Sequence, residues 1–202
     1  MILKLLLSFI VLITTSCTTL TKGTGEKTDV GVWEGKVQMQ NSKSSNRKWA
    51  YVTWVSDSPQ QRMRIDIRAI LDVPVATYMQ KSQGAQLWLF TENKYFHSED
   101  AKTLFSYFVK IQIEPKLFFS FLGNPKSLGE SWSCENKESI YTCFSPKHKT
   151  NVTIDHKDVD KRVIDIEKDG KSLRMRLFRS KVQVEDQQFR PFSTPQFDTI
   201  KI

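Results

Sequence analysis

Residues 61–68 alternate between apolar and charged side chains, and this alternation restricts the fold more than any other feature of the chain. Met63, Ile65 and Ile67 alternate with Arg62, Arg64, Asp66 and Arg68. Successive side chains of a β-strand point to opposite faces of the sheet. The spacing therefore predicts a strand with one buried face and one solvated face.

Other segments extend this strand into a mainly antiparallel sheet. Trp33, Gly35, Val37 and Met39 share one face of residues 33–40. Residues 48–55 and 86–90 are rich in aromatic side chains, and we expect both segments to be covered on both faces. Further strands are expected at residues 74–81, 151–155, 162–168 and 172–184, with an edge strand or a strap at 189–202. An antiparallel sheet of about ten strands usually curls, so its apolar face must be filled by helices or by a ligand.

Two short helices are expected in the middle of the chain. Ser98 is a candidate N-cap for the first helix, and Pro115 suits the first position of the second, which Gly123 ends. Their apolar stripes are Leu104, Phe105, Phe108 and Val109 in the first helix, and Leu117, Phe118, Phe121 and Leu122 in the second. The fold class is therefore α+β.

The N-terminus has the layout of an export signal. Lys4 precedes an uncharged apolar segment, residues 5–13, which as a helix would be about 14 Å long, too short for a hydrocarbon core of roughly 30 Å. Cys17 follows small residues and resembles the lipid-attachment cysteine of bacterial lipoproteins, although Thr14 stands where such signals usually have leucine. The resemblance implies a signal peptide at 1–16, acyl chains such as palmitate on Cys17, a tether at 17–30 and a single domain at 31–202. An ordinary export signal with an incidental cysteine is the alternative.

Cys134 and Cys143 are the remaining cysteines. In an exported protein such a pair predicts a disulfide that pins a hairpin. A metal-binding or redox-active pair is the alternative, but a second cysteine pair or a histidine cluster does not accompany it.

The net charge of +8 suggests an anionic partner. Arg174 and Arg176 fall on one face of a predicted strand, and we expect them to contact lipid head groups. A merely solvated face is the alternative. Nucleic acid is disfavoured because export separates the protein from it and a recognition motif is absent from the sequence.

Catalytic motifs are also absent from the sequence, which lacks a phosphate-binding glycine loop, a zinc-protease motif and a nucleophile elbow. His97 lies near Glu99 and Asp100, but a solvated strand end explains this group better than a metal or acid–base site. We predict no enzyme activity, no catalytic residues, no metal and no cofactor.

The order of elements resembles the LolA/LolB superfamily. The resemblance covers residues 31–184 and comprises W-x-G-x-V from Trp33, a tryptophan strand, the segment R-x-R-I-D-I from Arg62, an apolar corner and central helices before further strands. It implies an incomplete, half β-barrel with the two helices as a lid or plug over a cavity for acyl chains. The apolar corner is at residues 69–74, which match a protruding membrane-insertion loop in the lipid-anchored branch of the family. The resemblance therefore makes Ile70 and Leu71 the candidate tip of such a loop. Asp72 stands where the family often has glycine, and a buried turn residue is the alternative.

The predicted acyl-chain cavity combines the inner face of the sheet with the two helices. Its lining would be Trp33, Val37, Met39, Met63, Ile65, Ile67, Leu104, Phe105, Phe108, Phe118 and Phe121. An ordinary filled core is the alternative, because most apolar stripes serve that purpose.

These features favour a lipid-anchored periplasmic receptor or carrier that inserts acylated clients into the outer membrane. Its partners would be acylated lipoproteins or lipid, the membrane and a periplasmic carrier protein, with no nucleic acid, and it would act as a monomer. A structural or assembly lipoprotein with a filled core that binds a protein partner is the alternative.

Overall fold

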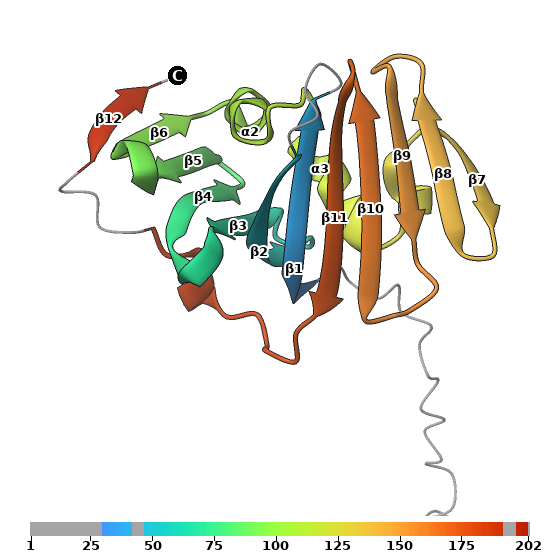
Figure 1. The fold of residues 1–202 in the computed structure, drawn as a ribbon, viewed down its shortest axis with the longest axis horizontal. Coiled ribbons are helices and arrows are strands. Elements are labelled where there is room, and N and C mark those ends of the chain that lie inside the picture. The colour runs from blue at the N-terminus through green and yellow to red at the C-terminus, as the bar shows by residue number, and fades with distance from the viewer. Residues whose placement is uncertain (1–29, 42–46, 192–196, 202) are drawn as a thin grey trace, which may run out of the picture.

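The computed structural model describes residues 30–41, 47–191 and 197–201. Within them the chain forms one open sheet and two α-helices, together with short 3₁₀ segments (Figure 1). The strands are β1 Val30–Asn41, β2 Arg47–Asp57, β3 Arg62–Arg68, β4 Pro74–Lys81, β5 Gly84–Leu89, β6 Lys94–Ser98, β7 Ser133–Lys137, β8 Ile140–Ser145, β9 Thr150–Asp155, β10 Lys161–Lys168, β11 Lys171–Arg179 and β12 Asp198–Lys201. The helices are α2 Ala101–Val109 and α3 Pro115–Leu122, and the 3₁₀ segments are η1 Ile70–Asp72, η2 Phe90–Glu92, η3 Pro125–Leu128 and η4 Asp186–Phe189.

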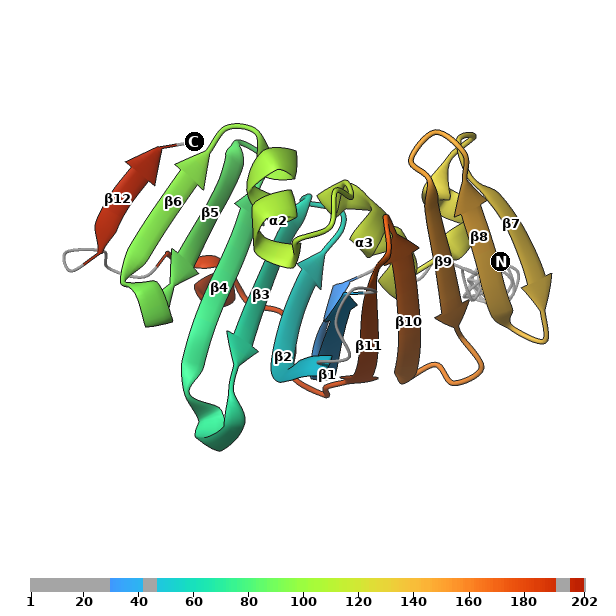
Figure 2. The same cartoon turned by 45° about the horizontal axis from the view of Figure 1, so that its top comes forward.

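The strand order is β12-β6-β5-β4-β3-β2-β1-β11-β10-β9-β8-β7. The described pairings are antiparallel except that of β12 with β6, which is parallel. β1 and β11 join the two halves of the chain, with Val37 opposite Met175. Figure 2 shows the twisted, curved sheet with α2 and α3 against one face, which we call the inner face. The sheet is not closed, and a mostly antiparallel sheet with two helices confirms the coarse fold prediction.

Alternation along the strands explains this arrangement. In β3, Met63 and Ile65 are buried on the inner face, and Arg62 and Arg64, which alternate with them, lie on the outer face and are half-buried. In β10 and β11, Ile164, Ile166, Leu173, Met175 and Leu177 are buried in the same way. These side chains join α2 and α3 in one core, so burial of alternate residues selects the register of each strand.

The helices begin and end close to the predicted positions, with one correction. The N-cap of α2 is Asp100, not Ser98: the Asp100 carboxylate accepts hydrogen bonds from the Lys102 N–H at 2.9 Å and the Thr103 hydroxyl at 2.5 Å. Ser98 instead ends β6, and its hydroxyl accepts a hydrogen bond from the Asp100 N–H. Pro115 begins α3 and Gly123 follows its last residue, as predicted.

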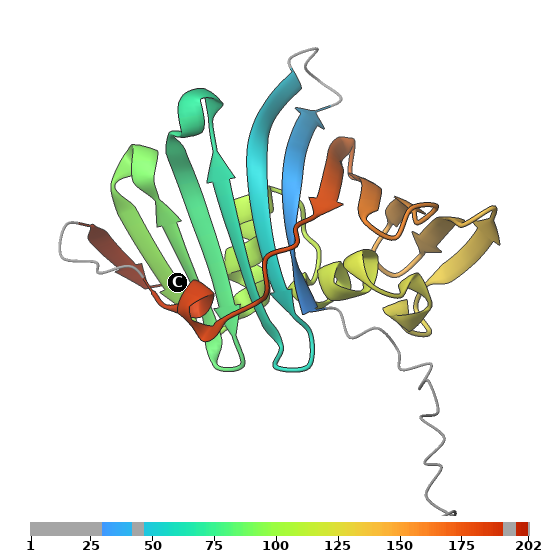
Figure 3. The same ribbon diagram turned by 90° about the horizontal axis from the view of Figure 1, so that it is seen from below.

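The segment after β11 crosses the outer face of the sheet (Figure 3). Phe189 of η4 packs on Val32 and Val55, and Asp186 pairs with Arg62 at 2.8 Å. The strand predicted at 172–184 ends earlier, at Arg179. After this residue the strand pairing with β1 ends and the chain turns across the outer face of the sheet. β12 then adds the predicted edge strand.

The expectation for residues 48–55 is wrong in its first half. Trp54 and Val55 are buried, but Trp49 is 49% exposed and Tyr51 is 41% exposed. Both point to the outer face, beyond the region that Phe189 covers. Aromatic content alone does not show whether a second layer lies above a strand.

Candidate functional site: an apolar cleft under the helices

An apolar cleft lies between the inner face of the sheet and the two helices. Its volume is about 40 Å³, and its walls consist of apolar side chains from four strands and both helices: Val37, Met39, Val52, Trp54, Ile65, Ile67, Phe108, Val109, Phe118, Leu173 and Met175. Met39, Ile67 and Phe108 are only half-buried, so the cleft reaches the surface beside the end of α2. A groove without charges favours an apolar ligand.

A chain of aromatic contacts holds the helices over this cleft. Phe118 of α3 lies 5.2 Å from Trp54 and 4.9 Å from Phe105 between ring centroids. Phe105 and Phe108 of α2 in turn contact Tyr78 of β4 at 4.9 and 5.6 Å. Aromatic pairs at such distances add to the free energy of burial, so the helices form a packed cover in this conformation.

The structure brings six of the eleven predicted cavity residues to the cleft. They are Val37, Met39, Ile65, Ile67, Phe108 and Phe118. The other five pack elsewhere in the same core and do not line the cleft: Trp33, Met63, Leu104, Phe105 and Phe121. Trp54 and Met175 also line the cleft, although the sequence analysis did not name them as cavity residues. The signal that identifies them is spacing, because each lies two residues after another lining residue of its strand, Val52 or Leu173, and so shares its face.

Trp54, one of the lining residues, also carries a buried polar group, its indole N–H. Its N–H is buried and finds no hydrogen-bond acceptor within the described residues. A buried donor without an acceptor typically costs 1–3 kcal/mol.

The C-terminus of α3 is held by a buried arginine that the sequence analysis did not identify. Arg162 of β10 is 8% exposed, donates a hydrogen bond to the Leu122 carbonyl at 3.1 Å and lies over the Trp33 ring at 5.2 Å. A cation at this position also interacts favourably with the negative end of the helix dipole. Its alternation with Ile164 and Ile166 is the signal that places Arg162 on the inner face.

The apolar corner forms a protruding tip. Leu71 is 89% exposed and Ile70 is 61% exposed, so the alternative of a buried turn residue is wrong. Leu71 and Asp72 both adopt positive φ, at 63° and 62°, which turns the chain sharply at the tip. The Asp72 carboxylate pairs with Arg68 at 3.0 Å.

The two predicted head-group residues lie together on the outer face of β11, and both are exposed. Arg174 makes a two-pronged ion pair with Asp165, with hydrogen bonds of 2.6 and 2.8 Å. For Arg176, an ion pair with another described residue is not found.

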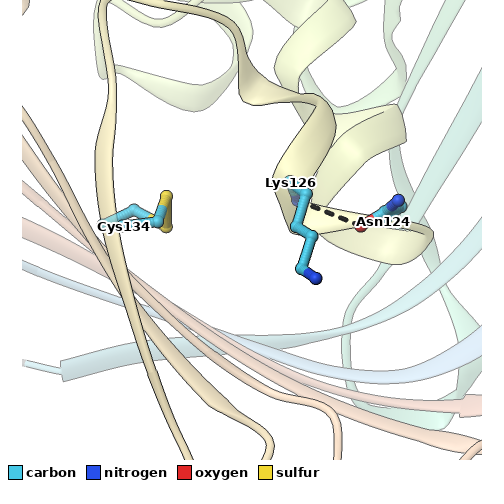
Figure 4. The surroundings of a disulfide bond; sticks show 4 residues. Asn124, Lys126 and Cys134 are labelled. Atoms are coloured by element: carbon cyan, nitrogen blue, oxygen red, sulfur yellow. Dashed lines mark hydrogen bonds between the residues drawn. A yellow bond between two sulfur atoms is a disulfide. The ribbon is translucent and has the colours of Figure 1, made fainter.

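The predicted disulfide is present and joins directly opposed residues of β7 and β8, with a Cα–Cα distance of 4.1 Å. Figure 4 shows Cys134 directed toward η3, where the Asn124 side chain accepts a hydrogen bond from the Lys126 N–H at 3.0 Å. Because β7 is an exposed edge strand, the disulfide ties it to its neighbour. Cys17 lies outside the described residues.

Among the described residues, a cluster of three or more histidine, cysteine or acidic side chains suited to a metal ion is not found. The described helices are also too short or too polar to span a membrane.

The chain was compared with known families and structures. Models of protein families gave no match, and curated proteins gave none. Among solved structures it is similar to an uncharacterized conserved protein from Thermus thermophilus, with 8% identity over 86% of this chain and 91% of that chain and a TM-score of 0.47. A LolA superfamily protein from Nitrosomonas europaea (8% identity, 82% and 91% coverage, TM-score 0.42) and a DUF1329 family protein from Desulfovibrio piger (10% identity, 82% and 91% coverage, TM-score 0.41) are also similar. These values are too low to assign a family or a function.

Proposed function

We propose that the protein is a lipid-anchored receptor or carrier that takes acyl chains of lipoproteins or lipids into its half-barrel and helps to insert them into the outer membrane. The observation that carries the proposal is the apolar cleft between the sheet and the helices, which reaches the surface at Met39, Ile67 and Phe108. The resemblance of the element order to the LolA/LolB superfamily suggests the same ligand class. Acyl chains need such a container because water opposes their exposure.

The cleft must widen to hold an acyl chain. Its volume of about 40 Å³ is close to that of one water molecule, whereas small-molecule sites occupy roughly 300–1,000 Å³. In the proposed carrier, the conformation with this narrow cleft would be the closed form.

The contacts of the two helices differ in a way that suggests which one moves. The end of α3 is held by the buried hydrogen bond from Arg162. α2 is attached to the sheet by aromatic contacts, by the hydrogen bond from the Tyr78 hydroxyl to the Ala101 carbonyl at 3.3 Å, and by an exposed hydrogen bond from the Lys171 ammonium to the carbonyl of its C-cap, Lys110. The methylene groups of an acyl chain can replace aromatic contacts, so we infer that α2 moves away from the sheet and α3 stays.

The buried Trp54 indole N–H, which has no acceptor among the described residues, favours a ligand that carries an acceptor, such as an acylated client. Acyl chains of lipoproteins end in an ester or amide carbonyl, which accepts a hydrogen bond. An incoming ligand could thus supply the acceptor that Trp54 lacks among the described residues.

Mass spectrometry under native conditions tests the proposal. The chain from residue 17 with Cys17→Ser keeps all described residues and is incubated with a palmitoylated peptide. We expect a one-to-one complex with this chain. Met39→Glu places a carboxylate in the lining and should weaken the complex at least tenfold, at a cost of roughly 1.4 kcal/mol or more.

Gln38→Glu is the matched control, because the neighbouring residue carries the same new charge on the outer face of β1. The control should bind the peptide as the parent chain does. If the parent chain forms no complex, the filled core of a structural lipoprotein with a protein partner becomes the better account, and the small volume of the cleft already favours it in this conformation.

A further inference from the structure

A group of aromatic and basic side chains lies on the outer face of the sheet, away from the cleft. We call it the outer patch and define it as Lys36, Trp49, Tyr51, Lys161, Arg176 and Phe178. Phe178 is 55% exposed, and Trp49 and Tyr51 are among the most exposed large apolar residues described. The segment around Phe189 covers the neighbouring part of the outer face but leaves these residues in contact with solvent.

The strand register brings these side chains side by side. Across β2, β1 and β11, Tyr51 is opposite Lys36, and Lys36 is opposite Arg176. The Lys36 ammonium lies 5.6 Å from the Trp49 ring centroid and 5.5 Å from that of Tyr51. On the other side, Lys161 lies 5.9 Å from the Phe178 ring.

The charges of the patch are not balanced internally. Lys36 and Arg176 are like charges directly opposite each other, an arrangement that destabilises a sheet. Within the described chain, an ion pair is not found for either of them. The acids nearby are Asp165, which Arg174 occupies, and Glu34, opposite Phe178. An anionic surface would relieve the repulsion between the two cations.

We propose that the outer patch binds the surface of a membrane that contains anionic phospholipids. Tryptophan and tyrosine rings prefer the level of the head groups, and lysine and arginine beside them attract anionic lipids. Exposed rings beside basic side chains suit a bilayer surface, which offers both environments at once.

The patch is continuous with the apolar tip. Tyr51 is opposite Arg68 in the next strand, and Arg68 pairs with Asp72 beside Leu71. Figure 3 shows η1 at the same end of the sheet as the start of β2. One membrane can therefore contact the tip and the outer patch together if the sheet leans on its outer face.

The chain length before β1 favours this leaning orientation, an argument that rests on the anchor at Cys17 in the proposed function. The register places Arg68 level with Lys36, and the tip begins two residues further on, so the tip lies roughly 30 Å from Val30 along β1. The chain from Cys17 to Val30 can span at most about 45 Å. An upright protein standing on its tip would need about two thirds of this maximum reach, whereas Lys36 is only about 20 Å from Val30, so the leaning orientation stretches the chain less.

Vesicle flotation tests the outer patch with the Cys17→Ser chain from residue 17. We expect binding to vesicles of phosphatidylethanolamine with phosphatidylglycerol, little binding to phosphatidylcholine alone, and weaker binding as salt increases. Lys36→Gln with Arg176→Gln should reduce partitioning roughly 25-fold, because each basic residue near an anionic surface contributes a factor of about five. Trp49→Ala with Tyr51→Ala should also reduce it.

Lys137→Gln with Lys157→Gln is the matched control, because both lysines are exposed and lie outside the patch. Equal partitioning of the patch and control variants would overturn the proposal. So would tight, patch-dependent binding of an acidic peptide without vesicle binding, which would indicate a protein partner. The test of the proposed function, binding of the palmitoylated peptide, uses no vesicles. A loss of vesicle binding can therefore be distinguished from a loss of acyl-chain binding.

Discussion

His156 and Arg162 are two polar residues that meet the end of α3 inside the molecule. The His156 ring makes a hydrogen bond to the backbone of Phe121, and its Nε2 is buried without a hydrogen-bond partner in the described part of the chain. Burial, with the charge of Arg162 as a second cause, lowers the pKa of His156 to about 4. The attachment of α3 therefore depends on a neutral histidine beside a permanent cation.

The protein should lose stability as the pH falls from about 6.5 to about 4. In this window the unfolded chain binds a proton at His156 and the folded chain does not, and the loss is on the order of 1–2 kcal/mol because solvent reaches part of the ring and screens its charge. Thermal unfolding at a series of pH values checks this expectation. In His156→Gln, the stability should depend less steeply on pH in that window, and equal slopes in the parent and the variant would contradict the expectation. Acids such as Asp100, whose lowered pKa affects stability at lower pH, are present in both proteins.

At the scale of elements, η1 shows how a short segment presents apolar side chains to solvent. Two consecutive residues with positive φ leave Leu71 projecting, and Arg68 binds the carboxylate of Asp72. Entry of an unpaired carboxylate into the bilayer centre costs roughly 2.5–3.5 kcal/mol, and the ion pair lowers this cost. The departure from glycine at this position is therefore compatible with membrane contact.

Leu71→Glu should slow the transfer of a bound palmitoylated peptide to vesicles at least tenfold. The reason is that an added charge at the tip opposes entry into the apolar layer, while the cleft is unchanged. Transfer can be followed by fluorescence of a labelled peptide, with binding in solution measured beside it. Val159→Glu is the control, since Val159 is an exposed apolar residue elsewhere; transfer at the parental rate in Leu71→Glu would remove the insertion role from η1.

At the scale of the whole molecule, the two faces of one sheet have different proposed roles. The inner face with α2 and α3 forms the apolar cleft, and the outer face carries the aromatic and basic patch. The alternation of side chains along β1 supplies both, since Val37 and Met39 face inward and Lys36 faces outward. Proposed ligand binding and proposed membrane contact are thus separable by mutation.

Local patterns predicted most of this architecture. The period of two in β3 and β11 and the cap-and-stop residues Pro115 and Gly123 identified elements that the structure contains. What they could not predict depends on packing between distant segments. The exposure of Trp49 and the end of β11 at Arg179 are set by where η4 comes to lie, which a single segment of sequence does not encode.

The central claim is that acyl chains enter the cleft, and photolabelling tests it most directly. A palmitoyl peptide with a diazirine on the acyl chain is bound to the Cys17→Ser chain, irradiated and mapped by peptide mass spectrometry. We predict saturable labels on lining residues such as Met39, Ile67 and Phe108, which unlabelled palmitoyl peptide competes away. Labels confined to the outer face around Trp49 and Tyr51, or labelling that does not saturate, would contradict the account.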